Sequence, residues 1–309
     1  MTSDKPFRPP ADGVVYGALD VGGTHVTGAL IAFDQRQPVV RSVTRVSLQP
    51  DGTAEHLLST IASCADSLAG RSGMDWAVAV PGPFDHERGV AQYRSVGKFD
   101  ALYGVDLRGE LSARMQARPG SLTFVNDAEA FLIGEWSHGA ASGHVRVVGI
   151  TLGTGVGSAF LADGTIVADG PLVPPEGRAD LLQHDGRPLE DTVSRRAIIA
   201  RYRERTGQLL DVRDIAARAR GGEAVAQTLL DGTFRALGQA LDPWLLRFAP
   251  TLVVVGGSMT GSWDLLEPAI SSGLTGRYAA SGVLARAAHP DSAALVGAVQ
   301  QVRRTERLE

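Results

Sequence analysis

The chain of 309 residues is longer than one hydrophobic core usually extends, so its length predicts two lobes. Its hydrophobic share of 44% and charged share of 21% are typical of a globular protein, and its net charge of -4 argues against general binding to nucleic acid or anionic membranes. The only cysteine, Cys64, excludes an internal disulfide and a thiolate zinc site, and we expect it to pack in the core.

The start of the chain, residues 1–13, is rich in proline and polar residues and has no apolar leader segment, so we expect it to be flexible. No uninterrupted apolar run reaches the length that spans a membrane. We therefore expect a soluble, cytoplasmic protein without a membrane partner.

Apolar patterning predicts that the first half of the chain alternates strands with helices. The predicted strands are residues 14–19, 26–33, 39–47, 77–80 and 122–125, and the predicted helices are residues 55–71, 111–115 and 128–136. Pro81-Gly82-Pro83 ends the fourth strand and places a loop at its carboxyl end, where α/β sheets commonly bind ligands.

The second half of the chain repeats this plan. Its predicted strands are residues 145–152, 157–162, 165–168 and 251–255, and its predicted helices are residues 191–205, 212–219, 224–248, 263–271 and 291–304. We predict a smaller N-terminal α/β lobe, residues 14–125 with 291–305, and a larger C-terminal α/β lobe, residues 126–290.

Two glycine-rich turns, Asp20-Val21-Gly22-Gly23-Thr24 and Gly153-Thr154-Gly155-Val156-Gly157, each join two apolar runs as a β-hairpin does. Glycine allows positive φ and close approach, so successive N–H groups can point at an anion, and the threonines add hydroxyl donors. Either turn alone is equally well explained as an ordinary hairpin, but the pair favours two related lobes that bind one phosphate chain. The spacings of a P-loop and of a dinucleotide fold are both missing.

Asn126-Asp127 follows a buried strand and opens a helix, which places the Asp127 carboxylate at the carboxyl end of that strand. A carboxylate there can take the proton of an attacking hydroxyl in phosphoryl transfer, a reaction that needs an aligned nucleophile, charge stabilisation and a base. The alternative is that these residues only cap the helix. The two phosphate-type turns favour the catalytic interpretation.

Four further features suit ligand binding. Asp20 ends the first strand and can hold Mg²⁺ through water, or it can simply cap the turn. The Glu190 and Glu176 carboxylates suit polyol hydroxyls, which are donors, although either can be a solvated charge. Gly256-Gly257-Ser258 joins a strand to a helix and can receive an anion or the edge of a nucleotide. The seven histidines show no metal-ligand spacing, and we expect each to be a surface or core residue.

The order and spacing of these motifs from Val14 to Arg304 resemble the ROK family (repressor, open reading frame, kinase) of the actin-like, hexokinase and Hsp70 superfamily. The resemblance includes Gly134-Glu135 and Leu189-Glu190 beside the motifs above. It implies an α/β, two-lobed, actin-like ATPase (ribonuclease H-like) fold with a ligand cleft between the lobes. It also implies a homodimeric kinase that uses ATP and Mg²⁺ to phosphorylate a hexose or a polyol such as a C7-cyclitol.

The resemblance also implies roles for single residues. Asp127 would be the general base, and Asn126, Glu190 and Gly82 would bind substrate hydroxyls, with Glu176 as a further candidate from its chemistry. ATP and its phosphates would be bound by three segments, namely Asp20, Gly22, Gly23 and Thr24; Gly153, Thr154 and Gly155; and Gly256, Gly257 and Ser258.

The chain departs from the family pattern at the substrate side. It lacks the family's Gly-Glu-x-Gly-His and its cysteine-rich zinc loop, so we expect no zinc, and Arg94-Ser95-Val96-Gly97-Lys98-Phe99 replaces the asparagine-containing stretch that contacts hexoses. These departures leave the acceptor open. They also leave two alternatives, a non-catalytic sugar-sensing or sugar-binding protein and a kinase with another donor such as polyphosphate. Because the first strand begins at Val14, we expect no helix-turn-helix and no nucleic-acid partner.

Overall fold

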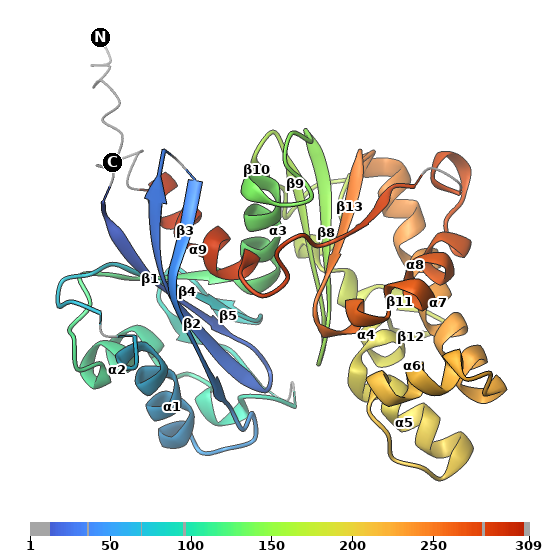
Figure 1. Cartoon of the computed structure of the whole chain (residues 1–309), viewed down its shortest axis with the longest axis horizontal. Helices are drawn as coiled ribbons and strands as arrows, with labels where there is room; N and C mark the ends of the chain where they lie inside the picture. Colours follow the sequence, from blue (N-terminus) through green and yellow to red (C-terminus); the bar gives the residue numbers. More distant parts are fainter. Residues whose placement is uncertain (1–12, 36, 69, 95–96, 280–281, 306–309) are drawn as a thin grey trace. The chain divides into compact units, whose positions relative to one another are not determined.

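The computed structural model describes residues 13–35, 37–68, 70–94, 97–279 and 282–305 (Figure 1). The predicted flexible start therefore lies outside the described residues, apart from Gly13. The chain forms two compact units, of which the first contains the residues up to Ala130 and those from Ala294 on, and the second is Phe131–Ala293. Each unit is built around one five-stranded sheet.

The sheet of the first unit has the strand order β3-β2-β1-β4-β7. Its strands are β1 (Val15–Val21), β2 (His25–Asp34), β3 (Gln37–Ser47), β4 (Trp76–Val80) and β7 (Leu122–Asn126). Strands β1, β2 and β3 pair antiparallel, whereas β4 runs parallel to β1 and β7 runs parallel to β4. The carboxyl ends of β1, β4 and β7 therefore lie along one edge of the sheet.

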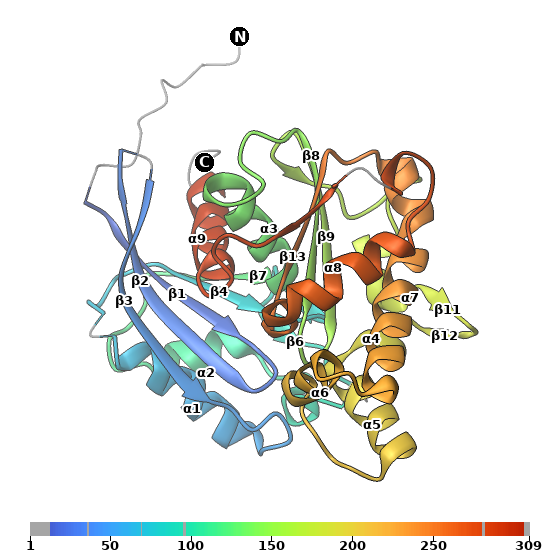
Figure 2. The same ribbon diagram turned by 45° about the vertical axis from the view of Figure 1, so that its right-hand side comes forward.

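Helices cover both faces of this sheet, with α1 and α2 on one side and α9 on the other (Figure 2). Their bounds are α1 (Ala54–Asp66), α2 (Leu107–Arg114) and α9 (Ala293–Thr305). Strand β4 contributes Trp76 and Val78 to the first face and Ala77 to the second, because alternate residues of a strand point to opposite faces. Three short elements complete the unit, namely β5 (Phe84–Asp85), β6 (Val90–Ala91) and the 3-10 turn η1 (Asp100–Leu102).

The sheet of the second unit repeats the first, with the order β10-β9-β8-β13-β14. Its strands are β8 (Arg146–Leu152), β9 (Val156–Ala162), β10 (Thr165–Ile166), β13 (Leu252–Gly256) and β14 (Leu284–Arg286). Again three strands pair antiparallel and the next two run parallel, so the predicted repetition of one plan is confirmed at the level of sheet topology.

The helices of the second unit pack with its sheet in one hydrophobic cluster. They are α4 (Glu190–Val193), α5 (Arg195–Thr206), α6 (Val212–Arg220), α7 (Ala224–Phe248) and α8 (Trp263–Ser272), and α3 (Asp127–His138) begins in the first unit and continues into the second. The short elements are β11 (Gln183–His184), β12 (Arg187–Pro188), η2 (Pro175–Gly177), η3 (Ala179–Leu181), η4 (Ser258–Ser262) and η5 (Gly276–Tyr278). Among the described helices, none is long and apolar enough to cross a membrane.

The predicted elements need four corrections, of which the first is that the helix predicted over residues 111–115 is α2 and begins four residues earlier, at Leu107. The helix predicted over residues 191–205 is two helices, because Ser194 is extended at φ -68° and ψ 154° and its side chain accepts a hydrogen bond from the N–H of Ala197. The helix predicted over residues 55–71 ends at Asp66, and the strand predicted over residues 165–168 ends at Ile166. Strands of two or three residues, such as β5, β6 and β14, were not predicted because they are too short to show a period.

Cys64 lies on the buried face of α1. Its side chain is fully buried in the cluster that α1 shares with the sheet, and its Sγ lies 3.7 Å from the carbonyl oxygen of Val26. Burial raises the pKa of the thiol to about 11. The prediction that Cys64 packs in the core is therefore confirmed.

Candidate active site

The polar residues predicted for the first unit gather at one edge of its sheet. Asp20 of β1 pairs with Ala79 of β4, and the next residue of β4, Val80, pairs with Asn126 of β7. The loop that contains Gly82 begins directly after Val80. The fold therefore brings to one carboxyl-terminal edge Asp20, the Gly82 loop, Asn126 and Asp127.

Asn126 and Asp127 also begin α3. The Oδ1 atom of Asn126 accepts hydrogen bonds from the N–H groups of Ala128 and Glu129 at 3.0 and 3.1 Å, and Oδ1 of Asp127 accepts one from Ala128 at 2.8 Å. Helix capping is thus part of what both residues do. It also fixes the Asp127 carboxyl group at the start of the helix, where the peptide dipoles favour a negative charge.

The pKa of Asp127 is raised, and burial is the main cause. The charge of Lys98 opposes the rise most, followed by backbone N–H groups at the start of α3 and by His86. A general base works best when its pKa lies near the operating pH. The environment of Asp127 therefore shifts its pKa in the direction that makes a carboxylate a stronger proton acceptor.

Asp20 is a second carboxylate of this edge whose surroundings raise its pKa. Burial raises the pKa of Asp20 to about 7, the charge of Asp127 adds to the rise, and the charge of Arg45 opposes it. A cation beside Asp20 would relieve this repulsion, and Mg²⁺ prefers oxygen ligands of this kind, so the residue fits the water-mediated role predicted for it. Within the described ranges, no group of three or more His, Cys, Asp or Glu side chains is arranged to hold a metal ion.

Two residues near Asp127 were not predicted, His86 and Lys98. Both interact with its charge from segments that follow the Gly82 loop. His86 comes only three residues after Pro83, and that position beside a ligand-type loop was a signal that the sequence offered. Lys98 belongs to the segment in which the family's asparagine is missing, of which residues 95–96 lie outside the described part of the chain.

The first glycine-rich turn joins β1 to β2. The N–H of Gly22 donates to the carbonyl oxygen of His25 at 2.9 Å, and Oγ1 of Thr24 lies 2.9 Å from Nδ1 of His25. Gly23 lies between them at the tip of the hairpin. The predicted hairpin is therefore present, with its glycines at the same edge of the sheet as Asp20.

The second turn lies beside the end of β13. The N–H of Gly153 donates to the carbonyl oxygen of Gly155 at 3.0 Å, and Gly256 of β13 pairs with Thr151 of β8. A Cβ atom on Gly257 would lie 2.3 Å from the carbonyl oxygen of Leu152. The structure thus joins two segments far apart in the sequence, Gly153-Thr154-Gly155 and Gly256-Gly257-Ser258.

The glycines in the two turns do not act through positive φ as expected. Gly22, Gly153 and Gly155 have no positive φ, whereas Gly257 has a φ of +88°. At Gly155, therefore, what glycine supplies is space rather than a left-handed backbone. A Cβ atom on Gly155 would lie 2.7 Å from Oε1 of Glu190, and one on Gly153 would have no neighbour within 4 Å.

The two glutamates predicted to bind substrate lie around one arginine of the second unit. Glu190 is half-buried at the start of α4, and Glu176 is exposed in η2 with a φ of 55°. Both interact electrostatically with Arg178, whose guanidinium pairs with Asp180 at 2.6 Å. The structure therefore places Glu190 against the second turn and Glu176 in the same charged cluster.

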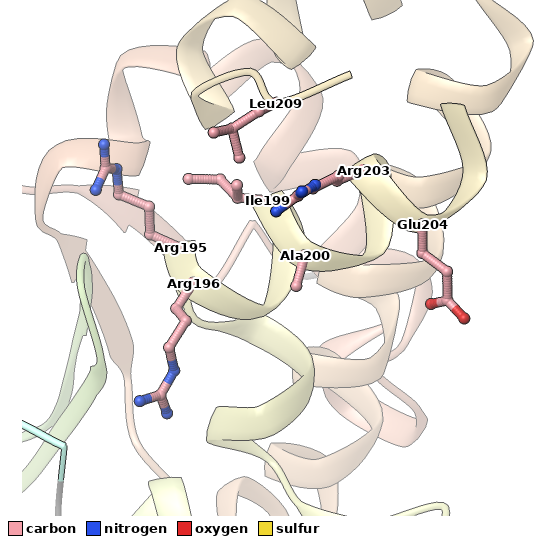
Figure 3. Close-up of a pocket in the computed structure, with 7 residues that line it drawn as sticks. All are labelled: Arg195, Arg196, Ile199, Ala200, Arg203, Glu204 and Leu209. Atoms are coloured by element: carbon pink, nitrogen blue, oxygen red, sulfur yellow. The ribbon is translucent and has the colours of Figure 1, made fainter. Parts of the chain in front are cut away.

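A pocket of about 610 Å³ lies beside α5 (Figure 3). Figure 3 shows most of its side chains projecting from this one helix. None of the residues predicted for the site lines the pocket, whose lining residues are Arg195, Arg196, Ile199, Ala200, Arg203, Glu204 and Leu209.

The chain is similar to known proteins over most of its length. The model of the ROK family matches residues 16–305. A glucokinase from Thermotoga maritima is 25% identical over 272 residues, which cover 80% of this chain and 83% of that protein. An N-acetyl-D-glucosamine kinase from Pectobacterium carotovorum is 26% identical over 305 residues, which cover 92% and 97%.

A solved structure gives the same result for the fold. A ROK family glucokinase from Streptomyces griseus, crystallised with glucose and AMPPNP, superimposes with a TM-score of 0.73 over 94% of this chain and 99% of that chain, at 22% identity. The predicted α/β, actin-like fold is therefore confirmed. Because the family model covers nearly the whole chain, the resemblance is confirmed as well, and the chain belongs to the ROK family.

Proposed function

We propose that this chain transfers the terminal phosphoryl group of ATP to a hydroxyl group of a sugar or sugar-like polyol, with Asp127 as the general base. The observation that carries the proposal is the position of Asp127, a partly buried carboxylate at the carboxyl end of β7 and the start of α3 with a raised pKa. The full-length relatives named as glucokinase and N-acetyl-D-glucosamine kinase support the reaction class. The chain is a phosphotransferase with an alcohol group as acceptor.

In this reaction the protein itself has to accept one proton, that of the attacking hydroxyl group. As the acceptor oxygen forms its bond to the γ-phosphorus, the bond from that phosphorus to the bridging oxygen breaks and ADP leaves. The acceptor's O–H proton passes to a carboxylate oxygen of Asp127, which is ionised beforehand. General base assistance of this kind contributes about two to four orders of magnitude in rate.

The residues of the first unit suit a metal-dependent donor. Asp20 would hold Mg²⁺ through water, and a bound Mg²⁺ neutralises phosphate charge during phosphoryl transfer. Gly22, Gly23 and Thr24 would offer backbone N–H and hydroxyl donors to the phosphates of ATP.

The residues of the second unit suit the nucleotide and the acceptor. Gly153, Thr154 and Gly155 would bind phosphate, and Gly256-Gly257-Ser258 would bind adenosine. Because sugar hydroxyls are donors, the acceptor residues would be Glu190 and Glu176, with Asn126 and Gly82 from the first unit. Whether the acceptor is a hexose or a C7-cyclitol depends on this set, in which the family's histidine is missing.

The test is ADP release with Mg²⁺ and ATP across hexoses, amino sugars and C7-cyclitols, with wild type, Asp127→Asn and the control Asp51→Asn. Asp51 is exposed and belongs to no proposed site. We expect turnover with one acceptor class, lost by two orders of magnitude or more in Asp127→Asn and retained in Asp51→Asn. Full activity of Asp127→Asn would overturn the base, and silence of the wild type across the panel would overturn the kinase assignment.

A further inference from the structure

His86 carries a buried polar atom with no partner among the described residues. Its Nε2 atom is shielded from solvent and makes no hydrogen bond there. Leaving such an atom unpaired costs about 1 to 3 kcal/mol, so an atom of this kind calls for an explanation, of which a ligand that fills the position is one.

The backbone and ring of His86 are held in place by their surroundings. The ring lies 5.3 Å from that of Phe84, and the guanidinium of Arg108 donates to the carbonyl oxygens of His86 and Glu87 at 3.4 and 2.9 Å. The N–H of Gly89 closes the turn by donating to the carbonyl oxygen of Asp85 at 2.8 Å. Nε2 of His86 is therefore carried by a hairpin whose backbone is held by several hydrogen bonds.

The position of His86 connects it to the candidate base. The charge of Asp127 acts on His86, and His86 in its protonated form acts in turn on Asp127. Burial lowers the pKa of His86, so its ring is neutral near pH 7 and Nε2 can donate or accept one hydrogen bond according to the tautomer. A sugar hydroxyl can do either in return.

A comparison with a second buried nitrogen that lacks a hydrogen bond shows why the position of His86 indicates a ligand. Nε1 of Trp76 also has no partner among the described residues. The Trp76 ring, however, fills the core beneath Gly17, where an added Cβ atom would lie 2.2 Å from it. In the part of the chain that the structure describes, only His86 has both a buried side-chain atom without a hydrogen bond and a charge interaction with Asp127.

We propose that Nε2 of His86 hydrogen-bonds a hydroxyl group of the acceptor close to the hydroxyl that Asp127 deprotonates, which makes His86 a specificity-determining residue. This inference rests on the proposed function. The carboxylates of Asp20, Asp127 and Glu129 share this region, so a neutral hydroxyl suits it better than an anion. The acceptor is then a polyol with two hydroxyl groups close together.

The test compares His86→Leu and His86→Gln with the control His56→Leu. Leucine keeps the apolar volume and removes the nitrogen, glutamine keeps a polar atom near the Nε2 position, and His56 is exposed on α1. For each protein we would measure the acceptor KM, the ATP KM, kcat and Tm. We would also measure by calorimetry, without ATP, the Kd of the acceptor found in the panel, or of D-glucose if no acceptor turns over.

We expect His86→Leu to raise the acceptor KM and Kd about tenfold, the loss of one hydrogen bond, while the ATP KM stays the same. We expect its Tm to stay the same or rise, because an unpaired atom has been removed; a structural role predicts a lower Tm instead. His86→Gln should restore most of the affinity, and His56→Leu should match the wild type.

Unchanged acceptor Kd in His86→Leu overturns the inference and leaves the kinase assignment intact. A wild type that binds sugar without phosphorylating it overturns the kinase assignment, while the Kd comparison still decides the role of His86. A wild type that binds no sugar or cyclitol of the panel overturns both, since the inference requires a polyol ligand.

Discussion

Two carboxylates at the edge of the first sheet, Asp20 and Asp127, are each destabilised in their charged form by burial. For Asp20 the charge of Asp127 adds to this effect. Burying two charged carboxylates does not stabilise the folded chain, and functional sites often lower the stability of a protein in this way. Substitutions of single residues are therefore the most direct tests of the site.

The first test concerns Asp20 and stability. Because the pKa of Asp20 is about 7 in the folded chain, against an ordinary value of 3.8 for aspartate, the folded chain holds the proton more tightly, and stability falls as pH rises from about 4 to 7. Without Mg²⁺, we expect Asp20→Asn to be more stable than wild type at pH 8, by up to about 4 kcal/mol at about 1.4 kcal/mol per pKa unit, and equal to it below pH 4. Urea unfolding at both pH values measures this.

The control for this test is Asp51→Asn, an exposed position where the substitution should change stability at neither pH. A wild type whose stability rises steadily from pH 4 to 8, with Asp20→Asn below it throughout, would contradict the assigned environment of Asp20.

The second test concerns Lys98 and pH. The charge of Lys98 lowers the pKa of Asp127, so Lys98→Met should raise that pKa. Since the base acts in its ionised form, the acid limb of kcat/KM should move to higher pH, and activity well above that limb should change little. The measurement is a pH–rate profile of both proteins.

The comparison variant is Arg88→Met, which removes a cation from a side chain that is 81% exposed. Its acid limb should coincide with that of the wild type. A Lys98→Met limb that moves to lower pH would show that Lys98 does not stabilise the ionised base.

At the scale of elements, α3 carries two acidic residues with different roles, a candidate catalytic one and a structural one, which its sequence does not distinguish. Its first residues carry the candidate base, and its later residue Glu135 is fully buried. The Glu135 carboxylate accepts hydrogen bonds from the N–H groups of Ala140 and Ala288 at 2.8 and 2.9 Å, and from His289 at 2.7 Å. This acidic residue therefore anchors the segment after β14 to α3 and is satisfied without a ligand.

This network predicts a stability effect. Glu135→Gln places an NH₂ group against N–H donors, so we expect it to destabilise the chain by about 2 kcal/mol. The exposed Glu204→Gln should have no effect. Thermal unfolding followed by circular dichroism measures both, and equal Tm values for the two variants would contradict the anchoring role.

Helices and strands with a clear hydrophobic period were predictable from the sequence. The ends of these elements and the shortest strands were not. The hydrophobic pattern located α7 at Ala224–Phe248 because twenty-five residues give a long periodic signal. It joined α4 and α5 because Ser194 fits a helix as well as a cap until its φ and ψ are known. The candidate site followed the same rule, since residues within motifs could be proposed from the sequence and the neighbours His86 and Lys98 were not.

At the scale of the whole molecule, two units with the same sheet order each carry one glycine-rich turn at a strand end. If both turns bind ligand, ligands must stabilise the whole fold by mass action. We expect AMPPNP with Mg²⁺ at about a hundred times its Kd to stabilise the chain by about 2.7 kcal/mol, seen as a rise in Tm.

An isosteric pair provides the control. A Cβ atom on Gly153 meets no neighbour within 4 Å, so Gly153→Asp and Gly153→Asn should both fold. The carboxylate should repel phosphate and abolish the rise in Tm, whereas the amide should keep much of it. The same rise in both variants would exclude phosphate from this turn.

The sequence by itself determined the α/β class, the repeated plan, the family and the motif residues, because periodicity and glycine-rich turns are local properties of the chain. The tertiary structure decided what depends on pairing between distant segments. Strand register brought Asp20 and Asn126 to one sheet edge, and Gly257 against Leu152. Burial then raised the pKa values of Asp20 and Asp127 and left Nε2 of His86 without a hydrogen bond among the described residues, because desolvation depends on neighbours that no local pattern specifies.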